Sequence, residues 1–152
     1  MEKEPQKMFD ESIKFLRLLR GLEKIERSIY RPDDRRENDV EHSYQVTMLG
    51  WFLCNRFRLT LSTEKILKYG LVHDLVEVYA GDTPVYNTKN SSNTVETKQA
   101  REKIAFLRIK EEFHLDDEFV CAIDNYEKRL DEESVFIYEV DKFVPMFNQY
   151  ID

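Results

Sequence analysis

The sequence contains few of the residues that interrupt helices. Only 4 glycines and 4 prolines occur among its 152 residues, and these two residue types mark the many turns of sandwiches and barrels. With 41% apolar and 35% charged residues, the chain has the composition of a globular domain. Its length suits one domain that can bury a core. We therefore expect an all-α fold and a single domain spanning residues 1–152.

Cysteine, basic runs and long apolar runs are also scarce. Cys54 and Cys121 stand in apolar helical patterns without a CxxC motif, which predicts two buried thiols rather than a disulfide or a zinc site. The net charge is −7 and no run of five basic residues occurs, so nucleic-acid polymers are not expected partners. The N-terminus has no apolar signal core and no window approaches 18 apolar residues. These absences predict a cytoplasmic protein without a membrane span.

Apolar residues recur at steps of three and four along most of the chain. This period predicts helices over residues 6–25, 40–58, 63–80, 96–113, 117–129 and 132–150, with a break in the third before residue 80 left open. No segment is predicted to be a strand. The polar segments 28–38 and 82–95 are expected to be loops. Trp51 and the aromatic residues at 44, 52 and 57 are expected to pack in the core.

Capping residues set the expected helix ends. Asp39 can cap the second helix, and Ser62 or Thr63 can cap the third. Gly81 is expected to end the third helix. After residue 150 the apolar pattern stops without a capping signal, so a further helix is either absent from this protein or lies outside this sequence.

Ionisable residues gather in the apolar stretch LVHDLVEVYAGDTP at residues 71–84. His73 and Asp74 are adjacent, and Glu77 follows at i+4 and i+3 from them, so the three share one helical face. A solvated acidic helix end is the simple interpretation of an isolated His-Asp pair. The rest of the chain favours another interpretation.

Two further ionisable residues also stand in apolar helical patterns. His42 lies at the start of the second predicted helix, and Asp141 interrupts FIYEVDKFVPMF. A buried carboxylate costs several kcal/mol unless it is paired or coordinated. One divalent cation bound by His42, His73, Asp74 and Asp141 would resolve all of these placements. Manganese, iron, cobalt, nickel or zinc would suit this donor set, and magnesium is retained as a further candidate.

The pattern His42, His73-Asp74 and Asp141 resembles the HD-domain metal-dependent phosphohydrolase superfamily. ENDVEHSYQV resembles the first-histidine motif of the branch that contains the bacterial 5′-deoxynucleotidases and their eukaryotic relatives, and HDLVEVYAGDTP resembles that branch's HD-x-x-E-x-x-x-G-D-x-P signature. NYEKRLDEESVFIYEVDKF resembles its last motif. The similarity spans roughly residues 10–150.

This resemblance implies an HD-domain fold of about six or seven helices around one metal ion held by the same four residues. It implies phosphate release from nucleoside 5′-monophosphates, deoxyribonucleotides foremost. Glu77 would act as general base and Asp74 would share in catalysis; an alternative for Glu77 is to orient His73. Asp82 would bind the sugar 3′-hydroxyl beside Thr83, or serve only as a turn residue. Because relatives are commonly dimers or larger, a homo-oligomer is also implied.

The resemblance places a phosphate-binding arginine at Arg27, fifteen residues before the first histidine. Its rivals are Arg31, Arg35 and Arg36, which on the simpler interpretation form a solvated basic patch. Ser28 stands where the bacterial enzymes carry a tryptophan near the sugar. Serine can neither stack nor exclude a 2′-hydroxyl, so the selection between deoxyribo- and ribonucleotides is left open.

Two alternatives to a 5′-nucleotidase are kept. One is a related phosphohydrolase for another nucleotide, among which guanosine tetraphosphate is disfavoured because that branch has an acidic pair where this chain has Val76-Glu77. The other is a non-catalytic nucleotide-binding module. The presence of all four expected ligands and Glu77 favours an enzyme.

Overall fold

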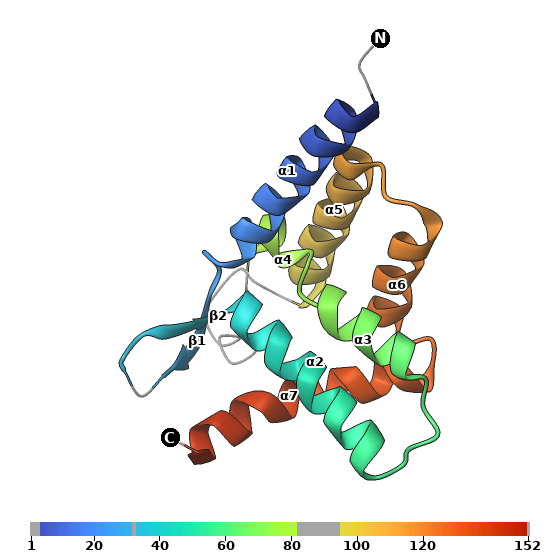
Figure 1. Cartoon of the computed structure of the whole chain (residues 1–152). Coiled ribbons are helices and arrows are strands. Elements are labelled where there is room, and N and C mark those ends of the chain that lie inside the picture. The colour runs from blue at the N-terminus through green and yellow to red at the C-terminus, as the bar shows by residue number, and fades with distance from the viewer. Residues whose placement is uncertain (1–3, 32, 82–94, 152) are drawn as a thin grey trace.

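The computed structural model describes residues 4–31, 33–81 and 95–151, and seven α-helices and two short strands make up this part of the chain. In chain order they are α1 (Glu4–Leu22), β1 (Glu26–Tyr30), β2 (Arg36–Asn38), α2 (Asp39–Arg56), α3 (Thr63–Val72), α4 (Glu77–Ala80), α5 (Val95–Phe113), α6 (Asp117–Lys128) and α7 (Glu132–Ile151). The expected all-α class is confirmed. Figure 1 shows α2 and α3 between the α1–α5 end of the molecule and α7, with the strands projecting to one side.

The close crossing of α2 and α3 sets the centre of the fold. A Cβ atom on Gly70 would lie 2.5 Å from Thr47 Oγ1 and 2.9 Å from Thr47 Cα, so glycine lets the two backbones approach. The core around this crossing consists of Val46, Cys54, Ile66, Tyr69, Val72, Ile123, Ile137, Val140 and Val144. The α2–α3 contact brings His42 on α2 near the end of α3.

The predicted capping residues locate most helix ends. Ser62 caps α3 by accepting a hydrogen bond from the Lys65 amide, and Gly81 ends α4 with a positive φ of 74°. The sequence left open whether the third helix breaks before residue 80, and it does: α3 ends at Val72 and α4 begins at Glu77. The prediction for α2 was wrong by one position. Asn38 is the cap, and Asp39 is the first helical residue and is fully buried.

The segment predicted as a loop at 28–38 contains all of β2 and the last three residues of β1, and the two strands pair antiparallel. The two strands are only 5 and 3 residues long, and they carry mostly polar side chains. Their burial alternates along the chain, with Arg27 and Ile29 turned inward on β1 and Glu37 turned inward on β2. The sequence prediction missed this alternation because two of the three inward residues are charged.

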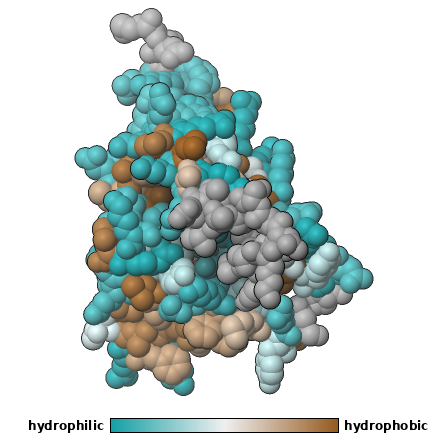
Figure 2. All heavy atoms as spheres, turned by 180° about the vertical axis from the view of Figure 1, so that it is seen from behind, coloured by the Kyte–Doolittle hydropathy of each residue, from teal (hydrophilic) through white to brown (hydrophobic). Residues whose placement is uncertain are grey.

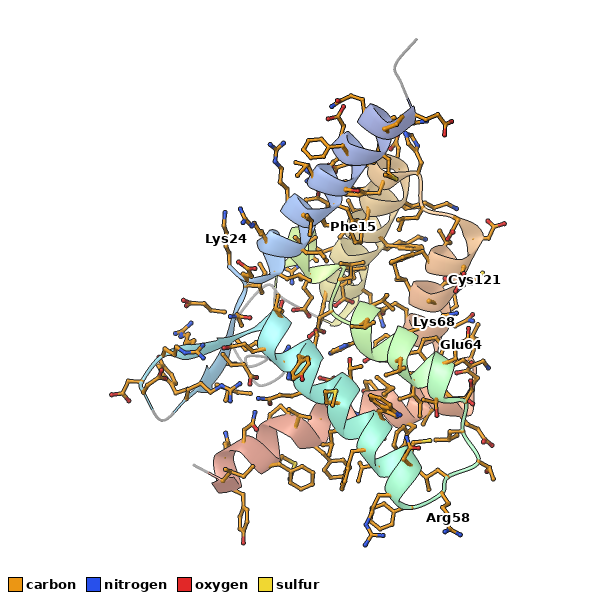
Figure 3. The ribbon with its side chains drawn as sticks, in the orientation of Figure 1. Phe15, Lys24, Arg58, Glu64, Lys68 and Cys121 are labelled. Carbon is orange, nitrogen blue, oxygen red and sulfur yellow. The ribbon has the colours of Figure 1, made fainter. Side chains whose placement is uncertain are left out.

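Two predictions about burial were also wrong. The aromatic side chains at 44, 51, 52 and 57 are 66%, 42%, 58% and 65% exposed, because α2 buries the opposite face through Val46, Gly50 and Cys54. Figure 2 shows from behind that apolar side chains gather at the edge of the molecule where α7 lies. Cys121 is exposed on α6, as Figure 3 shows, whereas Cys54 is buried as expected.

At the end of the molecule away from α7, an aromatic contact joins α1 to α5. Phe15 on α1 meets Phe113 on α5 edge to face, with ring centroids 5.6 Å apart (Figure 3).

Among the described helices, none combines the length and apolar character needed to cross a bilayer.

Candidate metal centre

Four side chains with nitrogen or oxygen ligand atoms meet where α2, α3 and α7 come together. His42 lies in the first turn of α2, and His73 and Asp74 directly follow α3. Asp141 lies in the middle of α7, 99 residues from His42 in the sequence. His42, His73 and Asp74 are buried, and Asp141 is half-buried. The fold therefore gathers this set from distant parts of the chain.

The distances within the set suit one small cation. His42 Nε2 lies 2.7 Å from Asp141 Oδ1, and His73 Nε2 lies 3.2 Å from Asp74 Oδ2. The crossed pairs, His42 Nε2 to Asp74 Oδ2 and His73 Nε2 to Asp141 Oδ1, are both 3.9 Å apart. Ligand atoms about 2.1 Å from an ion and at right angles to each other lie about 3 Å apart. His42, His73 and Asp141 offer ligand atoms that all lie within 4.8 Å of one another, as a shared metal ion requires, and Asp74 Oδ2 lies within 3.9 Å of both imidazole Nε2 atoms.

His73 is oriented as a metal ligand by its own helix. Its Nδ1 lies 2.8 Å from the Gly70 carbonyl oxygen, which can only accept a hydrogen bond, so Nδ1 carries the proton. Its buried Nε2 makes no hydrogen bond with any described residue. A buried ring nitrogen that faces Asp74 and Asp141 without a hydrogen bond is placed as a metal ligand would be.

The charges of the set favour a cation in the same place. Burial lowers the pKa of His73, but the carboxylates of Asp74 and Asp141 outweigh it and raise the pKa to about 9. Burial would raise the pKa of Asp74, yet His73 and Arg27 hold it well below its usual range. Burial acts on Asp141 in the same direction, and hydrogen bonding to His42 keeps its pKa low. Both carboxylates are thus held ionised beside two imidazoles, and these are the charges that a divalent ion seeks.

Glu77 lies beside this set at the start of α4. It is 5% exposed, and it groups with Asp39 and Asp74, whose carboxylate oxygens all lie within 4.8 Å of one another. Lys98 on α5 reaches the same place, with Nζ 3.7 Å from Glu77 Oε1 and 3.3 Å from Glu102 Oε1. Burial would lower the pKa of Lys98, but Glu77 and Glu102 raise it, so the ammonium stays charged against Glu77.

Arg27 enters the centre from β1 and is surrounded by carboxylates. Its Nη1 lies 2.9 Å from Asp74 Oδ2 and 3.4 Å from Asp39 Oδ1. Its Nε lies 3.8 Å from Glu37 Oε2, and its Nη2 lies 4.0 Å from Asp141 Oδ1. The guanidinium therefore supplies positive charge beside Asp39 and Asp74, and Lys98 supplies it beside Glu77.

The other residues of the hairpin are arranged differently. Ser28 follows Arg27 on β1 and is exposed. Arg35 pairs with Glu41 and Arg36 lies near Glu26, and both arginines are exposed. Arg31 pairs with Glu37. Among the four arginines considered from the sequence, Arg27 is therefore the one that contacts Asp74.

Sequence reasoning missed Glu37 and Lys98, and it gave Tyr126 no role beyond its place in the last motif. Glu37 is 0% exposed and its Oε2 lies 3.5 Å from His42 Nδ1. The Tyr126 ring meets the His73 ring edge to face, with centroids 5.7 Å apart. The available signals were the inward alternation of β2 and the helical period of α6, which places Tyr126 beside Ile123 and Ala122.

The two residues expected to contact the sugar, Asp82 and Thr83, lie outside the described residues. Most of the predicted loop at 82–95 also lies outside them.

The sequence is similar to those of two curated 5′-deoxynucleotidases. The chain is 27% identical over 139 residues to a 5′-deoxynucleotidase HDDC2 of Danio rerio and 31% identical over 129 residues to a 5′-deoxynucleotidase of Cronobacter sakazakii. These alignments cover 87% and 80% of this chain but only 64% of each relative, so the chain spans less than two thirds of their length.

Solved structures share the fold. A crystal structure of a predicted metal-dependent phosphohydrolase from Magnetospirillum magnetotacticum has a TM-score of 0.77 at 24% identity, covering 97% of this chain and 74% of that one. A conserved hypothetical protein from Pyrococcus furiosus has a TM-score of 0.67 at 23% identity, covering 91% and 80%.

The family itself follows from the sequence match. The sequence model described as HD domain matches residues 19–152, which is most of the chain and includes every residue of the candidate centre. The chain therefore belongs to the HD domain family.

Proposed function

We propose that the protein is a metal-dependent phosphohydrolase that releases phosphate from nucleoside 5′-monophosphates, deoxyribonucleotides foremost among them. The convergence of His42, His73, Asp74 and Asp141, with Glu77 beside them, carries this proposal. The two relatives named as 5′-deoxynucleotidases support the substrate class.

The four converging side chains would hold one divalent cation, drawn from Mn, Co, Fe, Ni, Zn or Mg. When bound, such a cation lowers the pKa of a coordinated water and polarises a phosphate oxygen. Asp74 has a second role in this arrangement, because its Oδ2 also contacts Arg27 Nη1 at 2.9 Å. Asp74 therefore connects the metal ligands to the cation proposed to bind phosphate.

Glu77 is the proposed general base. It is a buried carboxylate in the same acidic group as Asp74, within reach of a water molecule held at that group. Lys98 contacts Glu77 Oε1 from α5 and favours the ionised carboxylate, which can accept the proton of the attacking water. The water oxygen would bond to phosphorus as the ester P–O bond breaks, and the proton taken up by Glu77 would be returned to the departing 5′-oxygen of the nucleoside.

Arg27 is the proposed phosphate ligand. Its planar guanidinium can donate two parallel hydrogen bonds to phosphate oxygens. It lies beside Asp74 and 4.0 Å from Asp141, so a phosphate next to the metal ligands is within its reach. Asp82 and Thr83 are proposed to contact the sugar on the basis of the sequence motif alone.

A phosphate-release screen tests the proposal. Each ribo- and deoxyribonucleoside 5′-monophosphate is incubated with the protein and Mn²⁺, Co²⁺, Mg²⁺ or Zn²⁺. We expect release of inorganic phosphate that depends on the added metal and disappears in Asp74→Ala. Pyrophosphate released from a longer nucleotide, or full activity in Asp74→Ala, would overturn the proposal.

A further inference from the structure

We infer that Glu37 is a positioning residue for the metal centre, which fixes His42 in the tautomer and ring orientation that metal binding requires. This inference rests on the proposed function, because it concerns the same metal site. It adds to that function a buried carboxylate on β2 that does not itself face the ion.

The position of Glu37 is unusual for a charged residue in a short strand. Its neighbours on β2 are the exposed Arg36 and the half-buried Asn38, whereas Glu37 is fully buried. Its Oε2 lies 3.5 Å from His42 Nδ1. Both atoms are buried, and neither makes a hydrogen bond with any residue in the described ranges. Each is therefore the available partner of the other.

The proton of His42 explains why an acceptor is needed there. His42 Nε2 faces Asp141 and Asp74 at 2.7 and 3.9 Å, so Nε2 is the nitrogen that would bind the ion through its lone pair. A neutral imidazole that coordinates through Nε2 carries its proton on Nδ1. That buried N–H needs an acceptor, and Glu37 Oε2 is placed to accept it.

Surrounding donors keep the Glu37 carboxylate in place. Arg31 Nη2 lies 2.9 Å from Glu37 Oε1, and Asn148 Nδ2 on α7 donates to the same oxygen at 3.2 Å. Arg27 Nε lies 3.8 Å from Oε2. The charge is thus compensated from the hairpin and from α7, and Oε2 remains directed at His42.

The two histidines of the centre are held in different ways. His73 donates its Nδ1 proton to the Gly70 carbonyl at 2.8 Å, whereas His42 would donate its proton to a carboxylate. A carboxylate acceptor makes the imidazole a stronger ligand than a carbonyl does, and loss of such a partner costs about 10–100-fold in metal affinity. Glu37 is therefore expected to contribute to metal affinity without touching the metal.

The test compares metal affinities by calorimetric titration with Mn²⁺ and Zn²⁺. We expect Glu37→Gln to raise the dissociation constant about 10–100-fold, because the amide is a weaker acceptor than the carboxylate. Glu37→Asp keeps the charge but retracts the carboxylate by one methylene, and we expect it to weaken binding as well. Circular dichroism verifies that each variant is folded at the titration temperature.

Glu26→Gln is the matched control. It removes the same charge from the same hairpin, and Glu26 is exposed and lies near the exposed Arg36. We expect its dissociation constant to stay within about twofold of wild type. A folded Glu37→Gln protein whose affinity also stays within about threefold of wild type would overturn the inference while leaving the proposed function intact. A wild-type protein that binds no divalent cation would overturn both.

A second measurement needs no variant. Nuclear magnetic resonance of the zinc-loaded wild-type protein reports which ring nitrogen of His42 carries the proton. We expect a proton on Nδ1 that exchanges slowly with solvent, because it is buried against Glu37. Zinc-loaded protein in which Nδ1 of His42 carries no proton, or one that exchanges as fast as in a free imidazole, would overturn the inference.

Discussion

Replacing Arg27 by methionine should destabilise the protein when no metal is added, although the new side chain has a similar length. The Arg27 guanidinium has four carboxylates within 4.0 Å, those of Glu37, Asp39, Asp74 and Asp141. Removing one partner from a buried ionic group leaves the others uncompensated and costs about 3–5 kcal/mol. For a chain of about 150 residues each 1 kcal/mol shifts the melting temperature by about 2–4 °C, so Arg27→Met is expected to melt about 6–20 °C lower.

Added metal should recover part of this loss. A divalent cation at the four proposed ligands relieves the repulsion among the same carboxylates, so the increase in melting temperature on adding Mn²⁺ should be larger for Arg27→Met than for wild type. Phosphate release should nevertheless fall, because the proposed phosphate ligand is missing. Thermal denaturation with EDTA and with Mn²⁺, together with the phosphate assay, measures these effects.

Arg35→Met is the control for Arg27. Arg35 lies in the same hairpin, and its pairs with Glu41 and Asp33 are solvent-exposed, so its loss should leave the melting temperature close to wild type. If Arg27→Met melts at the same temperature as Arg35→Met in EDTA, the surrounding carboxylates do not depend on Arg27 and the reasoning fails.

Three further results are expected. Glu77→Gln should lower kcat about 10²–10⁴-fold with little change in metal affinity by calorimetry, and a parallel loss of affinity would make Glu77 a metal-orienting residue instead. Gly70→Ala should lower the free energy of unfolding in urea by about 1–3 kcal/mol through overpacking against the Thr47 backbone. The loss should exceed that of Gly50→Ala, whose Cβ would meet side-chain atoms alone, the nearest being Ile137 Cδ1 at 2.8 Å; equal losses would show that α2 and α3 can separate freely. Burial alone would raise the pKa of Asp131, but hydrogen bonds from tyrosine, serine and lysine partners hold it at about 2 against an ordinary 3.8. The stability lost in Asp131→Asn should therefore be fully present above about pH 4 and vanish as the pH falls toward 2, and a loss that is constant over that range would contradict the pairing.

Local signals in the sequence predicted the helices well. The apolar period and the caps at Ser62 and Gly81 set the ends of α3 and α4 closely, because these signals act within one helical turn. The cap of α2 was missed by one residue, since Asn38 and Asp39 can both cap a helix. Asp39 is instead used inside the fold, 3.4 Å from Arg27.

The periodic pattern was less informative about burial. A helix with apolar residues on most sides does not show which side faces the core, and the aromatic residues of α2 turned out to be exposed. Cys121 differs from its buried neighbour Ala122 by a single position, about 100° around α6. Which face is buried depends on the neighbouring helices, and these are chosen by long-range packing.

The candidate site also combines residues that local spacing predicts with residues that only long-range packing brings together. His73, Asp74 and Glu77 could be grouped from their spacing alone, whereas the addition of His42 and Asp141 needed the cost of burying a charge and a family resemblance. Glu37 and Lys98 could not be found in this way. Both stand in polar segments that are typical of a solvated surface, and only the paired strands and the position of α5 bring them to the centre.

The most direct test of the metal centre is an anomalous difference map from crystals of the protein grown with Mn²⁺. A single site is expected, bonded to Nε2 of both His42 and His73 and to one carboxylate oxygen each from Asp74 and Asp141. A map with no peak at these four residues, or with the ion bound by Asp39 and Glu77 instead, would contradict the proposed centre.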